Sequence, residues 1–319
     1  MPCRHTDREG WVMRDLVNGY RLGATLYMPI VHPKVTECLS GESVFPAPSV
    51  VLCLEDGLAE NDVSKGLSIL RRVLSGPAFS IPLQVYVRPR SLGMALELAA
   101  WEGICRIDGF VAPKVVPETA EAWLDLATQA DLRLMPTLES AGFFDPARII
   151  SLREIFDGFN PTRIAALRIG GNDLLGAMAL RREAGMTSWE GPLAWFLSMV
   201  SSILISAGYP VAAPVFDVIE DIETLKREVA RDVAAGFISK TAIHPVQVPV
   251  ISSAFAVSKA EVEQAQAILG NKAAAVFKIG GVMCEPATHR GWAERILARQ
   301  QVFGLRDEIK PWPLKRVQE

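Results

Sequence analysis

The chain has 319 residues, half of them hydrophobic and 22% charged, with a formal net charge of −3. This composition is typical of a folded chain with a large core and excludes global disorder. Lys and Arg number 33 against 36 Asp and Glu, so the chain carries no excess of positive charge and we expect no nucleic-acid partner.

Cysteine usage and hydrophobic runs indicate the class of protein. The five cysteines are widely spaced and form no Cys-x-x-Cys pair, which argues against a disulfide framework and a zinc site. The charged N-terminus lacks a long apolar run, so we expect no signal peptide and a cytoplasmic location. Residues 191–216 hold no charge, but three prolines and four serines interrupt them. We therefore interpret this stretch as a buried helix and strand, and expect no membrane association.

Short apolar runs alternate with helix-length segments along the chain. The predicted strands are 24–28, 50–54, 83–87, 109–112, 132–135, 164–169, 211–216 and 237–243. The predicted helices between them include 62–74, 92–102, 118–129, 146–156, 193–207 and 219–235. This alternation predicts a parallel sheet, and eight repeats favour a closed (β/α)₈ TIM barrel of the α/β class over an open doubly wound sheet.

We expect the barrel to occupy residues 20–250 and a C-terminal helical appendage, or lid, to occupy 251–319. Ser258 followed by Glu261 is typical of a capping box and predicts a helix over 258–270. A small strand over 275–280 and a final helix over 292–301 follow. The charged tail 305–319, with two prolines, is either a docking arm or a frayed end.

Polar residues follow the predicted strands, at the face where a TIM barrel builds its active site. They are Glu55, Asp56, Arg88, Lys114, Glu139, Asp173, Asp217 and His244. Charged residues that merely begin loops would give a similar pattern at any one strand. Their recurrence on seven strands favours a functional site.

Glu139 and Asp173 are the predicted metal ligands, because carboxylate oxygens suit Mg²⁺. The alternative for each is an N-cap or a loop salt bridge. Arg88 is the predicted partner of a substrate carboxylate or enolate, since its planar guanidinium pairs with two oxygens at once. A salt bridge from Arg88 to Glu55 or Asp56 is the alternative, and both arrangements can hold together.

Six segments resemble known strand motifs, in order and with similar spacing over residues 24–290. They are VVLCLED (50–56), VYVRPR (85–90), DGFVAPKV (108–115), MPTLES (135–140), LRIGGNDL (167–174) and KTAIHPVQ (240–247). These segments resemble the citrate lyase β-subunit-like branch of the HpcH/HpaI aldolase family.

The resemblance implies a TIM barrel with Mg²⁺ bound by Glu139 and Asp173, and with Arg88 as a catalytic and substrate-binding residue. It implies a carbon–carbon lyase of the retro-aldol or retro-Claisen type. The substrate would be a small 3-hydroxy acid or its CoA thioester, such as citryl-CoA or malyl-CoA, with CoA as part of the substrate rather than a cofactor. Homo-oligomers are common in the family, and we expect one here, with a trimer as the state the resemblance implies.

Further site residues follow from the same motifs. The predicted substrate-binding residues, besides Arg88, are Glu55, Asp56, Arg90, Lys114, Gly171, Asn172 and His244. His244 is either a base or a structural residue of its Ile-His-Pro element. Residues 281–286 resemble a C-terminal segment that a neighbouring subunit can supply, which makes Glu285 a candidate catalytic acid or base, with a surface turn residue as the alternative.

Two departures from the family pattern affect the substrate. Cys53 replaces the first acid of the Asp-Leu-Glu-Asp motif, and Arg90 replaces an Asn. The extra Arg90 suggests a more negatively charged small substrate, such as a phosphate. The alternatives are therefore a related barrel enzyme that acts on a phosphorylated or nucleotide-linked biosynthetic substrate, and a non-catalytic binding or scaffold protein.

Overall fold

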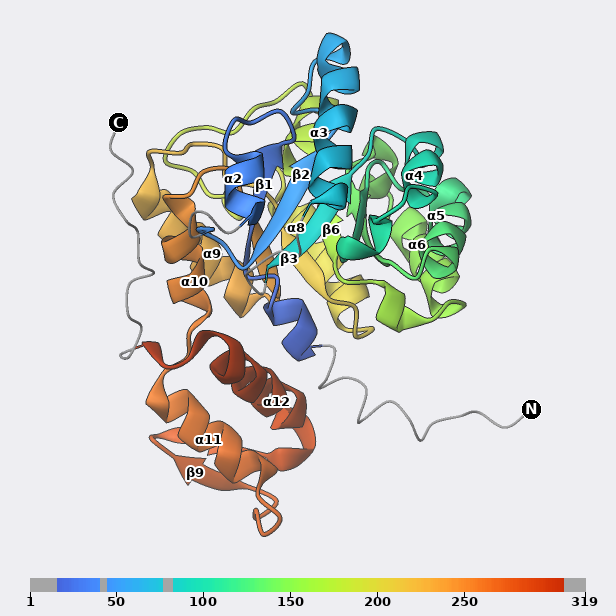
Figure 1. Ribbon diagram of the computed structural model, residues 1–319. Coiled ribbons are helices and arrows are strands. Elements are labelled where there is room, and N and C mark those ends of the chain that lie inside the picture. The colour runs from blue at the N-terminus through green and yellow to red at the C-terminus, as the bar shows by residue number, and fades with distance from the viewer. Residues whose placement is uncertain (1–15, 41–44, 77–82, 307–319) are drawn as a thin grey trace, which may run out of the picture.

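Eight parallel strands close into a barrel in the order β1 to β8, and β8 pairs back with β1 through Ala24 and Lys240 (Figure 1). The computed structural model describes residues 16–40, 45–76 and 83–306. The strands are β1 (Ala24–Pro29), β2 (Ser49–Cys53), β3 (Gln84–Arg88), β4 (Gly109–Ala112), β5 (Arg133–Leu138), β6 (Leu167–Ile169), β7 (Val211–Ala213) and β8 (Ser239–Ala242). The predicted TIM barrel is confirmed.

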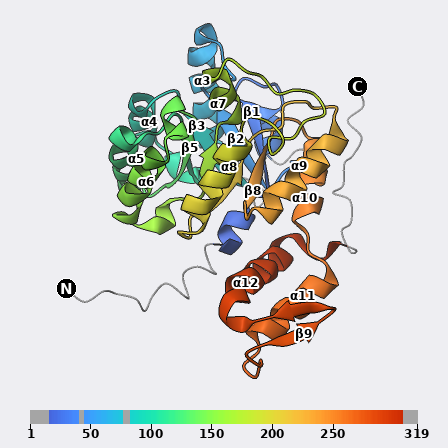
Figure 2. The same ribbon diagram turned by 180° about the vertical axis from the view of Figure 1, so that it is seen from behind.

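Helices follow the strands and cover the barrel from outside (Figures 1 and 2). They are α2 (Val35–Ser40), α3 (Val63–Ser75), α4 (Leu92–Ala99), α5 (Pro117–Gln129), α6 (Pro146–Asp157), α7 (Gly171–Ala177), α8 (Ala194–Val200), α9 (Ile222–Ala234) and α10 (Gln247–Phe255). Single 3₁₀ turns span Glu60–Asp62, Ile104–Arg106, Ala141–Phe144 and Pro161–Arg163. Local signals set several helix starts: the Ser91 hydroxyl accepts from Met94 N–H, and Asp145 caps α6 just before Pro146.

The uncharged stretch 191–216 forms α8, a π-helical turn over Ser201–Ile205, and β7. Helix α8 buries Phe196, Leu197 and Val200 in the core. The strand ends at Ala213 rather than at the predicted residue 216, because Pro214 has no N–H to continue the ladder. In the part of the chain that the structure describes, no helix is long and apolar enough to cross a membrane.

The C-terminal appendage lies at the amino-terminal end of the barrel strands (Figures 1 and 2). It consists of α11 (Lys259–Leu269), an antiparallel pair of β9 (Phe277–Ile279) and β10 (Val282–Cys284), and α12 (Pro286–Phe303). The Ser258–Glu261 capping box is present as predicted. Helix α12 begins six residues before the predicted start, at Pro286, a residue type that favours the first turn of a helix.

Contacts between α12 and the barrel involve the loop before β8 and the end of α10. Arg295 donates a 2.7 Å hydrogen bond to the Gly236 carbonyl, and Arg299 donates one of 2.8 Å to the Phe255 carbonyl. The barrel core includes Phe255, and a second, smaller core begins at Val257. The predicted division after residue 250 therefore falls within α10. A separate C-terminal domain stays a prediction, and residues 307–319 of the tail lie outside the described residues.

Candidate active site

A cavity of about 480 Å³ opens at the carboxyl ends of the barrel strands. Its walls come from the ends of β1, β2, β3, β5, β6 and β8 and from the loops that follow β6 and β7. Predicted site residues that line it are Asp56, Arg88, Glu139, Gly171, Asn172 and Asp173. The structure thus brings the two predicted metal ligands and the predicted substrate arginine into one cavity.

Arg88 ends β3 and is almost fully buried between carboxylates. Its Nε lies 2.5 Å from Glu55 Oε2, and its Nη2 lies 3.1 Å from Glu139 Oε1 and 3.6 Å from Asp56 Oδ2. Burial opposes its charge, but the surrounding acids hold the pKa of Arg88 above its ordinary value. The salt bridge considered as an alternative is therefore present, and it orients a charged guanidinium that also faces the cavity.

Glu139 follows β5 and is only 4% exposed. One carboxylate oxygen accepts the Lys114 backbone N–H at 2.7 Å, and Lys114 adopts a positive φ of 49° there. Burial raises the pKa of Glu139 to about 7, against the opposing charge of Arg88 and with the added repulsion of Asp173. A cation between Glu139 and Asp173 would relieve this repulsion.

The donor set fits Mg²⁺ better than a transition metal. Among residues 16–40, 45–76 and 83–306, no three His, Cys, Asp or Glu side chains cluster as a ready-made metal site. Mg²⁺ commonly uses only one or two protein carboxylates and completes its shell with water and substrate oxygens. Glu139 and Asp173 fit that requirement.

Glu55 and Lys114 lie behind the cavity wall. Glu55 holds Arg88, and Lys114 Nζ lies 3.6 Å from Glu55 Oε1 with 59% of its side chain exposed. Both support the site through Arg88 and Glu139, and neither lines the cavity.

Arg90 points away from the cavity. Its guanidinium donates to the Leu54 carbonyl at 2.9 Å and to the Leu58 carbonyl, and it pairs with Glu60 at 2.6 Å. These three contacts fix the loop after β2. Arg90 is used within the protein, and its predicted contact with substrate has no support in this arrangement.

His244 is exposed and outside the cavity lining. Its Nδ1 accepts the Val246 N–H at 3.2 Å, within the turn that starts α10. Nearby, Gln247 is buried and joins two loops, since it accepts from Ile243 N–H and donates to the Phe216 carbonyl. This geometry matches the structural alternative for the Ile-His-Pro element.

Glu285 precedes α12, and the structure does not bring it to the cavity. Its Oε2 accepts the Thr288 hydroxyl at 2.9 Å. Helix α12 contacts the barrel from Arg295 onward, at the amino-terminal end of the strands, whereas the cavity lies at their carboxyl ends. Any contact of Glu285 with a cavity of this kind requires a second copy of the chain.

Residues inside the barrel that sequence patterns missed also line the cavity. They are Tyr27, Cys53, Thr137, Arg168 and Thr241, of which only Cys53 drew attention as a departure from the family motif. One feature of the sequence could have indicated Arg168 as a site residue: it is a charged residue within the otherwise apolar strand β6.

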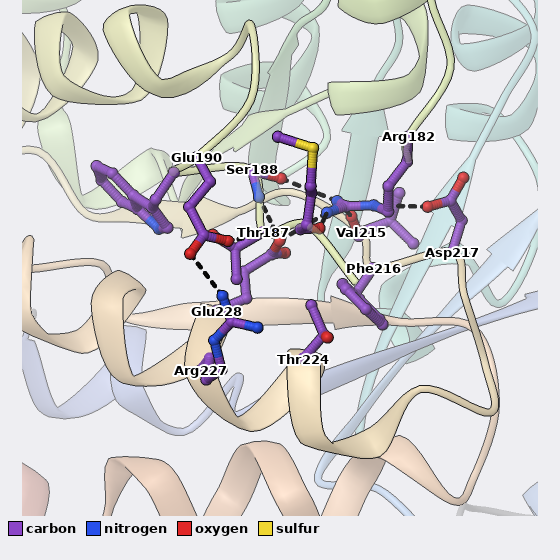
Figure 3. Close-up of polar contacts among 12 residues, drawn as sticks. Arg182, Thr187, Ser188, Glu190, Val215, Phe216, Asp217, Thr224, Arg227 and Glu228 are labelled. Atoms are coloured by element: carbon purple, nitrogen blue, oxygen red, sulfur yellow. Dashed lines mark hydrogen bonds and ion pairs between the residues drawn. The ribbon is translucent and has the colours of Figure 1, made fainter. Parts of the chain in front are cut away.

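A buried arginine anchors the segment between α7 and α8 to the rim of the barrel (Figure 3). Arg182 Nε pairs with Asp217 Oδ1 and its Nη1 with Glu228 Oε2, both at 2.7 Å, while Nη2 donates to the Val215 carbonyl at 2.9 Å. Glu228 also pairs with the fully buried Lys240. Because Val215 lines the cavity, this network fixes one wall of the site. Asp217 follows a strand, as the polar pattern noted, but it pairs with Arg182 in this network and does not line the cavity.

Comparison with known proteins gives the same family as the sequence motifs. A sequence profile of the C-C bond lyases of the TIM-barrel fold matches residues 16–305. A (3S)-malyl-CoA thioesterase of Cereibacter sphaeroides is 24% identical over 258 residues, which make up 80% of this chain and 82% of that protein. The predicted resemblance to citrate lyase β-like enzymes is confirmed at the level of the family.

Solved structures share the fold. The protein CitE of Mycobacterium tuberculosis, in complex with magnesium, acetoacetate and coenzyme A, matches with a TM-score of 0.65 and 23% identity, over 88% of this chain and 99% of that one. A malate synthase of Haloferax volcanii matches with a TM-score of 0.58 and 18% identity, over 72% of this chain and 71% of that one.

Proposed function

The chain belongs to the family of C-C bond lyases of the TIM-barrel fold, and on that premise we propose that it is a Mg²⁺-dependent carbon–carbon lyase. Its substrate is a small 3-hydroxy acid or the CoA thioester of one, such as malyl-CoA or citryl-CoA. The observation that carries this proposal is the convergence of Arg88, Glu139 and Asp173 on one cavity. The complex of the similar CitE with magnesium and coenzyme A supports it.

Glu139 and Asp173 would hold the metal, which supplies a Lewis acid that polarises a carbonyl and stabilises the enolate left by cleavage. Arg88 binds the oxygen anions of the oxo-acid fragment, and Glu55 keeps its guanidinium turned toward them. Asp56, Gly171 and Asn172 shape the rest of the substrate cavity. The Lys114 N–H and Arg88 both donate to Oε1 of Glu139, whereas Oε2 accepts from Arg88 alone, at 3.3 Å, and would keep a lone pair for the cation.

The general acid or base of this proposal is Glu285 from a neighbouring subunit of a homo-oligomer. Two observations support it: Glu285 precedes α12 in the appendage, at the opposite end of the barrel from its own cavity, and the neighbouring β10 exposes Val282 and Met283 by 51% and 57%. A mixture of Glu139→Gln and Glu285→Gln proteins, each inactive alone, should regain part of the activity after subunit exchange. Failure of the mixture to regain activity, with mixed oligomers verified by native mass spectrometry, would exclude a contribution in trans.

Hydrolysis of a CoA thioester is a second candidate, favoured by the curated relatives named (3S)-malyl-CoA thioesterase. The two reactions give different products from malyl-CoA. Carbon–carbon cleavage releases glyoxylate and acetyl-CoA, whereas thioester hydrolysis releases malate and free CoA.

The decisive experiment incubates the protein with malyl-CoA or citryl-CoA and Mg²⁺ and identifies the products by mass spectrometry. Glu139→Gln and Asp173→Asn should each abolish turnover and weaken Mg²⁺ binding in calorimetry. Glu118→Gln, an exposed carboxylate on α5, is the matched control and should change neither. Undiminished Mg²⁺ binding by both site variants would overturn the metal assignment.

A further inference from the structure

Arg168 is a buried arginine in the wall of the cavity that finds no acidic partner in the described parts of the chain. It is 2% exposed and lines the cavity from β6. No carboxylate of residues 16–40, 45–76 or 83–306 lies within ion-pair distance of it, whereas Arg88 has three such neighbours. Its contacts are the Thr241 hydroxyl, the Met135 sulfur at 3.5 Å and Tyr27, which is a side-chain hydrogen-bond partner and whose ring centroid lies 5.1 Å from the guanidinium carbon.

This arrangement has an energetic cost for the folded protein. A guanidinium removed from water needs hydrogen-bond acceptors and a counter-charge, and a thioether is a weak acceptor. Burial lowers the pKa of Arg168, and the positive charge of Arg88 acts in the same direction, although Tyr27 opposes both effects. Both effects would be relieved by an anion in the cavity.

Thr137 adds a second unsatisfied group beside Arg168. The two residues are direct partners in the β5–β6 register, so their side chains point to the same face, into the barrel. The Thr137 hydroxyl is buried, has no hydrogen-bond partner among the described residues, and lines the same cavity. A guanidinium that lacks an acid and a hydroxyl that lacks a partner, side by side, form a built set of donors for an oxyanion.

The charges of the cavity point to the same conclusion. Asp56, Glu139 and Asp173 line the cavity with Arg88 and Arg168, and Glu55 and Lys114 lie behind its wall, so four acidic groups face three basic ones. Two added charges from Mg²⁺ would make the site positive. A site of this sign fits an anionic ligand.

We propose that Arg168 and Thr137 form an anion subsite, deeper in the barrel than the metal ligands, that binds a second anionic group of the substrate. The first anionic group is the one held by Arg88 and the metal, so this inference rests on the proposed function. The second group is a carboxylate or a phosphoryl-type group, since both present oxygens to a guanidinium and a hydroxyl. The subsite makes the enzyme selective for dianionic over monoanionic oxo-acid fragments.

Three probes that share a 2-oxo acid test this selectivity by calorimetry in the presence of Mg²⁺. Pyruvate has no second anionic group, oxaloacetate has a carboxylate on C3, and 3-phosphonopyruvate has a phosphonate there. The wild-type protein should bind at least one of the two dianions about tenfold or more tightly than pyruvate, since hydrogen bonds to charged groups are worth about one such factor each. The dianionic probe that binds more tightly identifies the second group as a carboxylate or a phosphoryl-type group.

Variants of the subsite should remove the preference and leave pyruvate binding unchanged. Arg168→Met should lower the affinity for the preferred dianion to that of pyruvate. Thr137→Val, which keeps the shape of the side chain, should lower it by a smaller factor and keeps the test valid if Arg168→Met does not fold. Thr128→Val on the outer helix α5 is the matched control and should change nothing.

The outcomes separate the subsite from the proposed function. Equal binding of all three probes by the wild-type protein, or a dianion preference that survives in Thr137→Val and Arg168→Met, overturns the subsite and leaves the lyase proposal standing. A wild-type protein that binds neither Mg²⁺ nor any of the probes overturns both.

Discussion

Gly170 and Glu139 are so close that a Cβ atom at Gly170 would lie 2.4 Å from both Cβ and Oε2 of Glu139. Glu139 follows β5 and Gly170 follows the neighbouring strand β6, so this contact joins the two loops that carry the predicted metal ligands. Only glycine allows this close approach, which sets the position of the Glu139 carboxylate relative to Asp173.

Gly170→Ala should therefore displace Glu139 and damage the metal site. We expect a loss of Mg²⁺ affinity of about tenfold or more, because catalytic and binding groups tolerate only about 0.5 Å of displacement. Overpacking should also lower the free energy of unfolding by about 1–3 kcal/mol. Isothermal titration with Mg²⁺ and urea denaturation measure the two effects.

Gly176→Ala in α7 is the matched control, since no described atom other than those of its chain neighbours and its own helix backbone lies within 4 Å of the place that a Cβ would take there. It should leave Mg²⁺ affinity unchanged and stabilise the helix slightly, by about 0.5–1 kcal/mol. Equal Mg²⁺ affinities for the two alanine variants would contradict the role of the close contact.

Mg²⁺ should stabilise the folded protein. A ligand that binds only the native state at 100 times its dissociation constant adds about 2.7 kcal/mol to the free energy of unfolding. Thermal denaturation with Mg²⁺ should show a raised midpoint, and chelation with EDTA should reverse it. Asp173→Asn should lose the shift, and a shift of unchanged size in that variant would place the ion elsewhere.

Arg182 should matter for stability far more than the exposed Arg227. Its side chain is 5% exposed and pairs with Glu228, which is fully buried, so Arg182→Met leaves a buried carboxylate with Lys240 as its remaining ion-pair partner. We expect the free energy of unfolding to fall by about 3 kcal/mol, as for other broken buried ion pairs.

The comparison variant is Arg227→Met, whose pair with Glu190 is largely exposed and should contribute little that urea denaturation can resolve. Similar losses of stability in both variants would show that the Arg182 network is no more important than a surface pair.

Cys53 should react slowly with iodoacetamide at pH 8, although it lines the cavity. Burial raises the pKa of the Cys53 thiol above its ordinary value of 9.0, so little of the reactive thiolate is present at that pH. The rate of Cys53 alkylation should keep rising beyond pH 9. The exposed Cys105 is the internal standard and should be modified at least about tenfold faster, as followed by peptide mass spectrometry. Equal rates at pH 8 would contradict the raised pKa.

The sequence determined most of the secondary structure and which residues lie at the carboxyl end of the barrel. Apolar runs marked most of the strands because strands buried on both faces need hydrophobic side chains, whereas the polar β8 was marked only by Phe237 and Ile238 before it. The position of Glu139 and Asp173 in one cavity was predictable because the carboxyl ends of parallel strands share one face. The capping box at Ser258 was predictable because its hydrogen bonds span only three residues.

Only the tertiary structure decided which distant side chains meet. Arg88 was predictable as a site residue, whereas its neighbour in the motif, Arg90, turned toward Leu54 and Glu60 because the loop after β2 offers carbonyl oxygens there. Arg168 joined the cavity because barrel closure places it beside Thr241, 73 residues away in the sequence. A local pattern records which face of a strand a residue occupies, but register and closure of the barrel determine what lies opposite to it.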